Sequence, residues 1–390
     1  MSPWPSVELG KIADVAMGQS PPGYTYNDDN DGLPFFQGKA DFGHQFPVVR
    51  RWCSQPQRIA EAGDVLLSVR APVGPTNVAK EPSCIGRGLA AIRARADRIE
   101  QEYLRLFFKY QEGALALRGQ GSTFGAISRR DIERLEVPLP PPAEQRRIVA
   151  ILDQADRLRR LRAEADAKAD RILPALFRKM FGDPNRPTLP MAQLPDLVDC
   201  LDHKRIPVRE SDRLGRTGDT PYYGANGLVG YIDEPIFDET LVLLAEDGGY
   251  WGPAEQSAYK IQGPSWVNNH AHVLRCKEGF DPDYIVWSLY LLDLRRFISG
   301  TTRGKLTQAG MNAVELPMAD RCLQSTFGKY ARSQMRLTVE RRRVQRGLRS
   351  GFANLLHSAF TGSLTSRWRK LHTQKLLVEI QQRASVVVEA

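Results

Sequence analysis

Two stretches of the chain carry apolar residues with heptad spacing. From Ile148 to Leu176, one apolar series recurs every seven residues and a second lies three or four residues from it, which is the pattern of a coiled coil. A second such stretch runs from Gln324 to Thr361. We expect the two helices to bury these seams against each other as an antiparallel coiled coil, while packing of each helix on its own globular domain is the alternative. The residues predicted for this coiled-coil and subunit interface are Ile148, Ile151, Leu158, Arg162, Ile172, Phe327, Leu337, Arg341, Val344 and Leu348.

The remainder consists of short apolar runs between turns rich in Gly and Pro. The runs 64–69 and 241–245 predict buried strands, and the spacing in 102–110 and 284–296 predicts helices. The fold class is therefore α+β, with two loop-rich domains separated by two long helices. The expected boundaries are 1–140 and 183–319 for the domains, 141–182 and 320–361 for the helices, and 362–390 for a helical C-terminal tail. Pro174 is expected to kink the first helix near its end.

The chain repeats itself. The segment from Gly121 through Glu136 to Pro138 is matched by the segment from Gly300 through Glu315 to Pro317, at an offset of 317 − 138 = 179 residues. This period exceeds the roughly 20–50 residues of a solenoid unit and indicates a duplicated domain, a pseudo-twofold internal repeat. A protein of two similar halves is expected to bind a target that itself has two halves.

The charge of the chain favours a polyanionic partner. The formal net charge is +9 and the isoelectric point is about 9.3, and positive potential attracts phosphate. The five cysteines are widely spaced without a C-x-x-C pair, which fits reduced thiols and a cytoplasmic location. No membrane span is expected. The only metal-like pattern, His270-Ala271-His272, is weak, so we expect no metal site.

Candidate DNA contacts are amides, hydroxyls, cations and aromatic residues on loops that follow predicted strands or contain glycine. Amides and guanidinium groups can pair with base edges, and hydroxyls and backbone N–H groups suit phosphate. The alternative is that the aromatic residues are core and the glycines form turns, which we favour for the aromatics; Lys39 and Asn226 are open between the two. The candidates are Gln19, Lys39, Arg70, Lys80, Arg87, Gln120, Ser122, Thr123, Lys204, Arg205, Tyr223, Asn226, Tyr250, Trp251, Asn268, Asn269, His270, Thr301, Thr302, Arg303 and Lys305.

At residues 138–149, where Pro-Leu-Pro-Pro-Pro leads through Glu-Gln-Arg-Arg-Ile into the first helix, the chain resembles the DNA specificity subunits of type I restriction–modification systems. The segment 359–365 after the second helix and the phrases around Gly88 and Asn226 carry the same resemblance. It implies two target-recognition domains joined by antiparallel helical spacers, each domain reading one half of a split double-stranded DNA site. It also implies two methyltransferase subunits that carry S-adenosylmethionine and methylate adenine, and restriction subunits that use ATP and Mg; no cofactor is expected in this chain.

No catalytic residues are predicted, because no methyl-donor site, target-base motif or nuclease cluster stands out. A self-sufficient modification enzyme and a dimeric-like DNA-binding regulator remain as alternatives. Arg162 and Arg341 occupy one place in the repeat and are expected to lie near the pseudo-twofold axis, with Asp166 or Glu340 as partners. The second helix lacks the proline run of the first, which leaves its first residue and register open.

Overall fold

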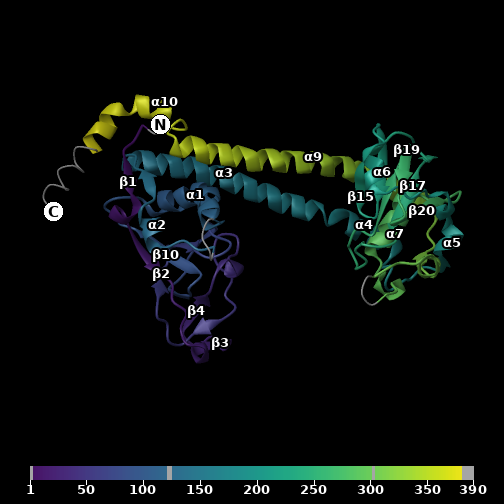
Figure 1. The fold of residues 1–390 in the computed structure, drawn as a ribbon, viewed down its shortest axis with the longest axis horizontal. Helices are drawn as coiled ribbons and strands as arrows, with labels where there is room; N and C mark the ends of the chain where they lie inside the picture. The colour runs from purple at the N-terminus through teal and green to yellow at the C-terminus, as the bar shows by residue number, and fades with distance from the viewer. Residues whose placement is uncertain (1–2, 121–124, 301–303, 380–390) are drawn as a thin grey trace. The chain divides into compact units, whose positions relative to one another are not determined.

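The computed structural model describes residues 3–120, 125–300 and 304–379 (Figure 1). The chain forms two compact units. The first unit combines Met1–Arg162 with Gln345–Ala390, and the second is Ala163–Val344. Each unit contains one sheet-bearing part, which we call the first head (residues 3–139) and the second head (residues 183–319).

The first head contains a four-stranded antiparallel sheet with the order β2-β10-β7-β8 and a five-stranded sheet with the order β3-β5-β4-β9-β6. Strand β1 pairs with β11 and ties the two ends of the head together. The strands are β1 Ser6–Glu8, β2 Ala13–Met17, β3 Tyr26–Asn27, β4 Leu33–Phe36, β5 Trp52–Cys53, β6 Ile59–Ala60, β7 Val65–Ser68, β8 Thr76–Val78, β9 Ser83–Ile85, β10 Leu89–Ala94 and β11 Glu136–Pro138. The helices are α1 Gln101–Gln120 and α2 Arg129–Glu133.

The second head repeats this plan. Its four-stranded sheets have the orders β13-β20-β17-β18 and β15-β14-β19-β16, and β12 pairs with β21 as β1 does with β11. The strands are β12 Met191–Gln193, β13 Val198–Cys200, β14 Thr220–Gly224, β15 Gly227–Ile232, β16 Phe237–Asp238, β17 Leu241–Ala245, β18 Ala258–Ile261, β19 Pro264–Val267, β20 Ala271–Cys276 and β21 Glu315–Pro317. The helices are α5 Leu194–Leu197, α6 Glu210–Leu214, α7 Pro282–Leu291 and α8 Gln308–Asn312.

The two predicted buried strands are confirmed. Every residue of β7 and of β17 is buried, because each is a central strand of its four-stranded sheet. A short, continuous apolar run suits a strand that is covered on both faces. The helix predicted at 102–110 is α1, which extends to Gln120, and the one predicted at 284–296 is α7, which ends earlier, at Leu291.

The long helices are α3 Pro142–Ala169, followed by α4 Ile172–Phe181, and α9 Arg321–Phe360, with α10 Ser366–Leu371 after it. The break between α3 and α4 has the predicted cause, at a slightly earlier position. Pro174 has no N–H to donate to the carbonyl of Asp170, and its ring clashes with that carbonyl, so the interruption falls at 170–171. Glycines follow both helix ends, Gly182 with φ +80° and Gly362 with φ +84°.

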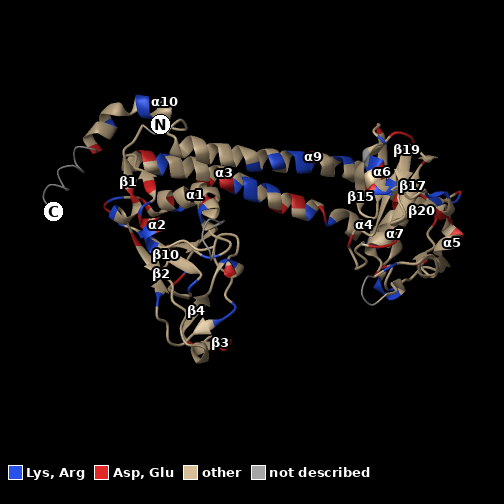
Figure 2. Ribbon diagram, viewed as in Figure 1, with Lys and Arg blue, Asp and Glu red and all other residues tan. Residues whose placement is uncertain are grey.

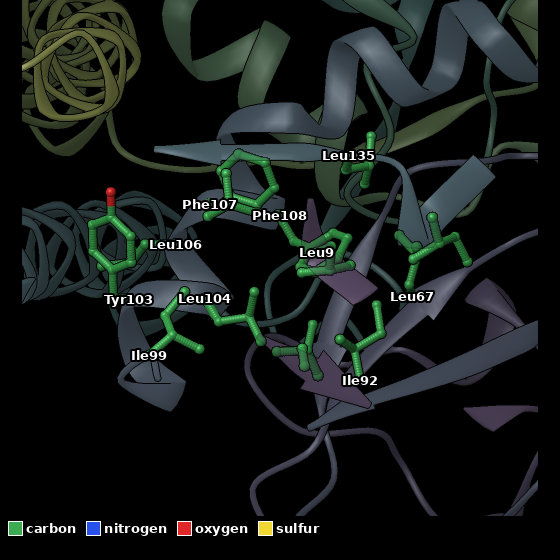
Figure 3. Packing of buried hydrophobic residues seen from close by; sticks show 14 of the residues in the cluster. Leu9, Leu67, Ile92, Ile99, Tyr103, Leu104, Leu106, Phe107, Phe108 and Leu135 are labelled. Atoms are coloured by element: carbon green, nitrogen blue, oxygen red, sulfur yellow. The ribbon is translucent and has the colours of Figure 1, made fainter. Parts of the chain in front are cut away.

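Each head is packed by the beginning of one long helix and the end of the other. In the first unit, Ile148 of α3 and Phe360 of α9 join the core around Tyr103. Figure 3 shows part of this cluster, with the side chains of α1 packed toward Leu9 and Leu135. In the second unit, Phe327 of α9 and Phe181 of α4 pack around Tyr284 in the same way.

The predicted coiled-coil seam is partly wrong. Ile148 and Phe327 are buried, Ile151 and Leu348 are half-buried, but Leu158, Ile172, Leu337 and Val344 are 58%, 49%, 52% and 44% exposed. The inward positions of α9 are instead those of Phe327, Ala331, Gln334, Thr338 and Arg341. The reason is that the heads bury apolar residues at the helix ends, while the facing positions between those ends are largely polar.

Within each unit the helices run antiparallel. In the first unit the Arg159 guanidinium lies over the Phe352 ring, 4.6 Å from its centroid. In the second unit Arg341 lies 3.8 Å from a carboxylate oxygen of Asp166 and 2.9 Å from one of Asp170. Asp166 is therefore confirmed as a partner of Arg341. Arg162, at the matching place in the repeat, is half-buried in the first unit.

Both heads join their following helix through the same hydrogen bonds. Gln145 accepts from the Glu100 amide and donates to the Pro140 carbonyl. Gln324, 179 residues later, accepts from the Asp281 amide and donates to the Ala319 carbonyl. Both glutamines are buried, and a buried amide side chain needs such partners. The repeat therefore conserves a rigid junction between head and helix.

Candidate nucleic-acid interface

In the first head, strand directions bring three predicted contacts to one end of the sheet. Met17 pairs with Ala90, and Ser68 pairs with Leu89, so the loops after β2 and β7 and the loop before β10 meet there. Gln19, Arg70 and Arg87 lie on these loops with exposed side chains. We call this set the first edge, and it presents two guanidinium groups and an amide to solvent.

Close packing of backbone holds the first edge together. A Cβ at Gly18 would lie 2.1 Å from the Gly86 carbonyl oxygen, and one at Gly88 would lie 2.3 Å from that of Gln37. Only glycine permits these approaches. Through the parallel pairing of β4 with β9, exposed Lys39 follows Gln37 on the neighbouring loop. Lys80 does not belong here, because β8 carries the chain past Val78, which pairs with Val65 at the opposite end of the sheet.

The second head builds an equivalent edge with different side chains. Ala245 pairs with Ala271, so Asp247 and Asn269 take the places that Arg70 and Arg87 hold in the first head. The exposed Lys204 follows β13 at the same end. A pocket of about 410 Å³ lies beside these residues, and Asn226, Asp247, Asn268 and His270 line it. We call Lys204, Asn226, Asp247, Asn268, Asn269 and His270 the second edge.

The second edge is internally hydrogen-bonded. His270 Nδ1 lies 2.8 Å from Asp247 Oδ1, and the His270 amide donates to Asn268 Oδ1 at 2.9 Å. Asn226 donates to the Gly248 carbonyl at 2.9 Å. A carboxylate partner on Nδ1 fixes the orientation of the imidazole and leaves Nε2 for another contact. The edge therefore presents oriented polar groups.

Behind the second edge lies an ionic network that uses two predicted DNA contacts. Arg205 pairs with Glu246 at 2.6 Å and with Asp202 at 3.2 Å, and Lys305 pairs with Glu246 at 2.8 Å. The side chain of Arg205 is largely buried, so the prediction that it contacts DNA gives way to a structural role. A buried guanidinium that pairs with two carboxylates cannot reach phosphate without giving up both ion pairs. Lys305 is half-exposed and remains a candidate.

The same network holds ionised carboxylates. Burial raises the pKa of Asp202, but hydrogen bonds from His272 and from the Val273 amide outweigh it and leave that pKa below its ordinary value. Burial is likewise outweighed at Glu246, whose pKa is lowered by Lys305 and Arg205. Asp202, Glu246 and His272 could in principle hold a metal ion, their ligand atoms lying within 4.8 Å of one another. However, His272 already bonds Asp202 and the Leu306 carbonyl, and two cations neutralise the acids.

The aromatic candidates divide. Tyr250 is exposed beside the second edge, whereas Tyr223 is half-buried against Tyr259. Trp251 packs against the second core, so core packing, which the sequence already favoured for the aromatics, replaces DNA contact there. Ser122, Thr123, Thr301, Thr302 and Arg303 lie outside the described residues, as does the side chain of Gln120. The described ends of both repeated loops reach the edges, since Ala126 bridges to Arg70 and Lys305 to Asp247.

Asp247 lies on the second edge but was not among the predicted contacts. A lone aspartate before two glycines is typical of a turn cap. The signal that could have found it is the repeat, because Asp247 follows its buried strand as Arg70 follows the matching one.

Figure 2 shows basic and acidic residues intermingled over both heads and several basic turns along α9.

The chain matches the family described as Type I restriction modification DNA specificity domain over residues 1–168 and 191–319, and it belongs to that family. Among its relatives, a putative type I restriction enzyme specificity subunit of Methanocaldococcus jannaschii is 40% identical over 157 residues, which is 40% of this chain and 37% of the relative. A putative specificity subunit of Haemophilus influenzae is 31% identical over 150 residues, 38% of this chain and 37% of the relative. The chain thus spans less than half the length of these curated relatives.

One solved structure supports the fold. The S subunit of a type I restriction–modification system from M. genitalium aligns over 92% of this chain and 96% of its own, with a TM-score of 0.61 at 15% sequence identity. The HsdS subunit from Thermoanaerobacter tengcongensis is 54% identical, but the alignment covers 40% of this chain and 37% of the other with a TM-score of 0.36. Within the described residues, no helix has the length and apolar character that crossing a membrane requires.

Proposed function

We propose that this chain is the DNA specificity subunit of a type I restriction–modification complex and that each head reads one half of a bipartite, asymmetric DNA site. The observation that carries the proposal is that each head has an equivalent sheet edge and that the two edges carry different side chains. Arg70 and Arg87 on the first edge suit guanine or phosphate, while the exposed Asn226 and Asn269 on the second suit adenine. Two different edges on one scaffold fit two different half-sites.

The family consists of specificity subunits, which are non-catalytic in general. We assign catalysis to partners: two methyltransferase subunits that bind S-adenosylmethionine, and restriction subunits that use ATP and Mg. The exposed or half-exposed residues Gln19, Lys39, Lys204, Tyr250 and Lys305 are proposed as supporting contacts to base edges or the DNA backbone.

An exposed apolar stripe on α9 supports docking of the methyltransferase subunits on the helices. Leu323, Tyr330, Leu337 and Val344 recur every seven residues, and each is at least 44% exposed. A heptad stripe that remains exposed within its own chain is the surface that another helix covers in a bundle. Leu337 and Val344, which were predicted to face the other long helix, are therefore proposed to contact a methyltransferase subunit instead.

The helices are also proposed to set the gap between the half-sites. The 28 residues of α3 correspond to a length of about 42 Å at 1.5 Å per residue. Half-sites read from one face of B-DNA lie about 34–36 Å apart. A spacer of this length is compatible with two half-sites about one helical turn apart.

Methylation-aware sequencing of host DNA, with and without this chain, tests the proposal. We expect methylated adenine in a split motif that depends on the chain. The double variant Arg70→Ala, Arg87→Ala should relax one half of the motif, and Asn226→Ala, Asn269→Ala should relax the other. Lys80→Ala, at the opposite end of the first sheet, is the matched control. An unsplit motif, or equal relaxation of both halves by either double variant, would contradict the assignment.

A methylation assay on the purified chain separates this function from a self-sufficient modification enzyme. We expect no methyl transfer from S-adenosylmethionine without added methyltransferase subunits and transfer when they are present. Transfer by the chain alone would favour the enzyme instead. A DNA-binding regulator would bind its site without supporting methylation in either mixture.

A further inference from the structure

The first unit contains a polar cavity that no residue of the first edge lines. It has a volume of about 710 Å³ and lies between α1, β8, the middle of α3 and Phe352 of α9. Its wall contains five Arg and Lys side chains and three carboxylates, those of Glu102, Asp153 and Asp156, so basic side chains exceed acidic ones by two. The basic side chains are Arg105, Lys109, Arg157, Arg159 and Arg160.

Two of these cations hold the unit together. Arg105 of α1 pairs with Asp153 of α3 at 2.8 Å, besides Glu102 at 2.6 Å. Arg159 pairs with Asp156 at 2.5 Å and lies over the Phe352 ring of α9. These contacts use all three carboxylates of the wall, so they account for Arg105 and Arg159 and leave the other three basic residues to be explained.

None of the other three has a carboxylate of the wall to itself, and Arg157 is exposed. Lys109 pairs with Glu112, which does not line the cavity. Arg157 has no carboxylate within 4 Å among the residues that the structure describes. The Nε of Arg160 is shielded from solvent and lies 3.4 Å from Asp156, in a geometry that makes no hydrogen bond. A buried donor without an acceptor is costly. Arg160 also shares Asp156 with Arg159, so positive charge at the wall remains for an anionic ligand.

We propose that this cavity binds phosphate groups through Lys109, Arg157 and Arg160, either of the DNA backbone outside the half-site or of a free nucleotide. The volume lies within the roughly 300–1,000 Å³ of ligand sites. Guanidinium and ammonium groups from two elements can hold several phosphate oxygens by charge-assisted hydrogen bonds. Because Lys109 belongs to α1 and Arg157 to α3, a bound phosphate would join the first head to its helix.

The second unit does not repeat this set of cations. At the offset of 179 residues, Arg157 corresponds to Arg336 but Arg160 corresponds to Val339. On the helix of the head, Tyr284 takes the place of Tyr103, so Tyr290 takes the place of Lys109. The site therefore belongs to the first unit, and Arg336 provides a matched control at the same place in the repeat.

Calorimetric titration of the full-length chain with pyrophosphate tests the site without DNA. We expect Arg157→Ala and Lys109→Ala each to weaken binding about 5- to 10-fold, the loss typical of one charge-assisted contact. Arg336→Ala and Arg147→Ala, the latter on an exposed turn of α3 outside the cavity, should bind as the unchanged chain does. Circular dichroism of each variant checks that the fold is retained.

Binding to a duplex at several salt concentrations identifies the source of the phosphate. If the DNA backbone occupies the cavity, Arg157→Ala should lower the salt dependence of DNA affinity by about one phosphate contact, with the methylated motif unchanged. If a free nucleotide occupies it, only pyrophosphate and nucleotide binding should weaken. The proposal is overturned if neither readout changes. That result would leave the proposed function intact, because the function depends on the edges and on the motif.

Discussion

The two heads share a scaffold and differ at the edge that faces solvent. Both have a central buried strand, a short strand pair that closes the head, and a buried glutamine that fastens the head to its helix. The first edge, however, presents Arg70 and Arg87 openly, whereas the second presents Asp247 bonded to His270 beside a pocket. Burial constrains the scaffold, because core residues must fill fixed space, while edge loops can change chemistry without loss of packing.

The attachment of the helices also differs between the two units. In the first, Glu144 is fully buried and accepts hydrogen bonds from Trp4, Thr365 and Arg369, which tie α3 to the C-terminal tail. The place that corresponds to Glu144 in the repeat is Leu323, which is exposed. We call the hydrogen bonds of Glu144 with Trp4, Thr365 and Arg369 the polar lock. It belongs to the first unit, and Leu323 makes no equivalent hydrogen bonds because its side chain is apolar.

The largest effect should come from the aromatic residues that the helix ends insert into the heads. Phe360→Ala should cost the first unit about 3 to 5 kcal/mol, and Phe181→Ala the second unit a similar amount, since each leaves a cavity in a packed core. Hydrogen exchange of the β7 and β17 amides measures the two units separately. Leu158→Ala, at an exposed position of α3, is the control and should change neither. If each variant loosened both units equally, the separate cores would be disproved.

Removal of the polar lock should rank next. Glu144→Ala should destabilise the first unit by about 3 kcal/mol, because it removes the carboxylate that accepts from the Trp4 indole N–H, the Thr365 hydroxyl and the Arg369 Nε. Leu323→Ala, the matched substitution in the second unit, should stay within about 0.5 kcal/mol. Limited proteolysis of residues 363–379 provides the measurement, since the tail should become accessible only in the Glu144 variant. Equal protection in both would show that the lock is not needed.

The edges should respond to mutation with smaller effects that differ in kind. Arg70→Ala should cost about 1 to 3 kcal/mol of DNA binding through loss of a base or phosphate contact. Asp247→Ala should cost less affinity and instead relax selectivity in the other half of the site, because His270 loses the partner that orients it. Binding to a library of split sites distinguishes the two outcomes. Identical selectivity profiles for both variants would refute the contrast between the edges.

The smallest effect should be a loss of stability of the second head at acid pH. The pKa values of Asp202 and Glu246 in the folded second head lie below their ordinary values, so these groups stabilise the head above about pH 4. That stability should be lost as the pH falls through the lowered pKa values. Urea unfolding from pH 6 to pH 3 measures it, and Asp202→Asn should flatten the dependence. An unchanged slope in this variant would exclude Asp202 as a source.

The sequence alone determined the duplicated plan. The apolar runs at Val65–Ser68 and Leu241–Ala245 identified the central strands, because a continuous apolar run needs burial on both faces whatever surrounds it. Pro174 marked the interruption of the first helix, since the missing N–H is a local property of proline. The resemblance in residues 138–149 pointed to the family that the comparisons confirm.

Only the tertiary structure decided which helix faces are buried and which polar groups are available. Heptad spacing is equally present in Phe327, which packs into the second head, and in Leu337, which is exposed, because spacing defines a stripe but not its partner. Arg205 and Arg70 read alike as cations after strands. Asp202, three residues earlier, and Glu246, 41 residues later, nevertheless enclose Arg205, whereas among the described residues no carboxylate pairs with the exposed Arg70. Local pattern fixes periodicity and turns, whereas burial and pairing depend on contacts between residues that only folding brings together.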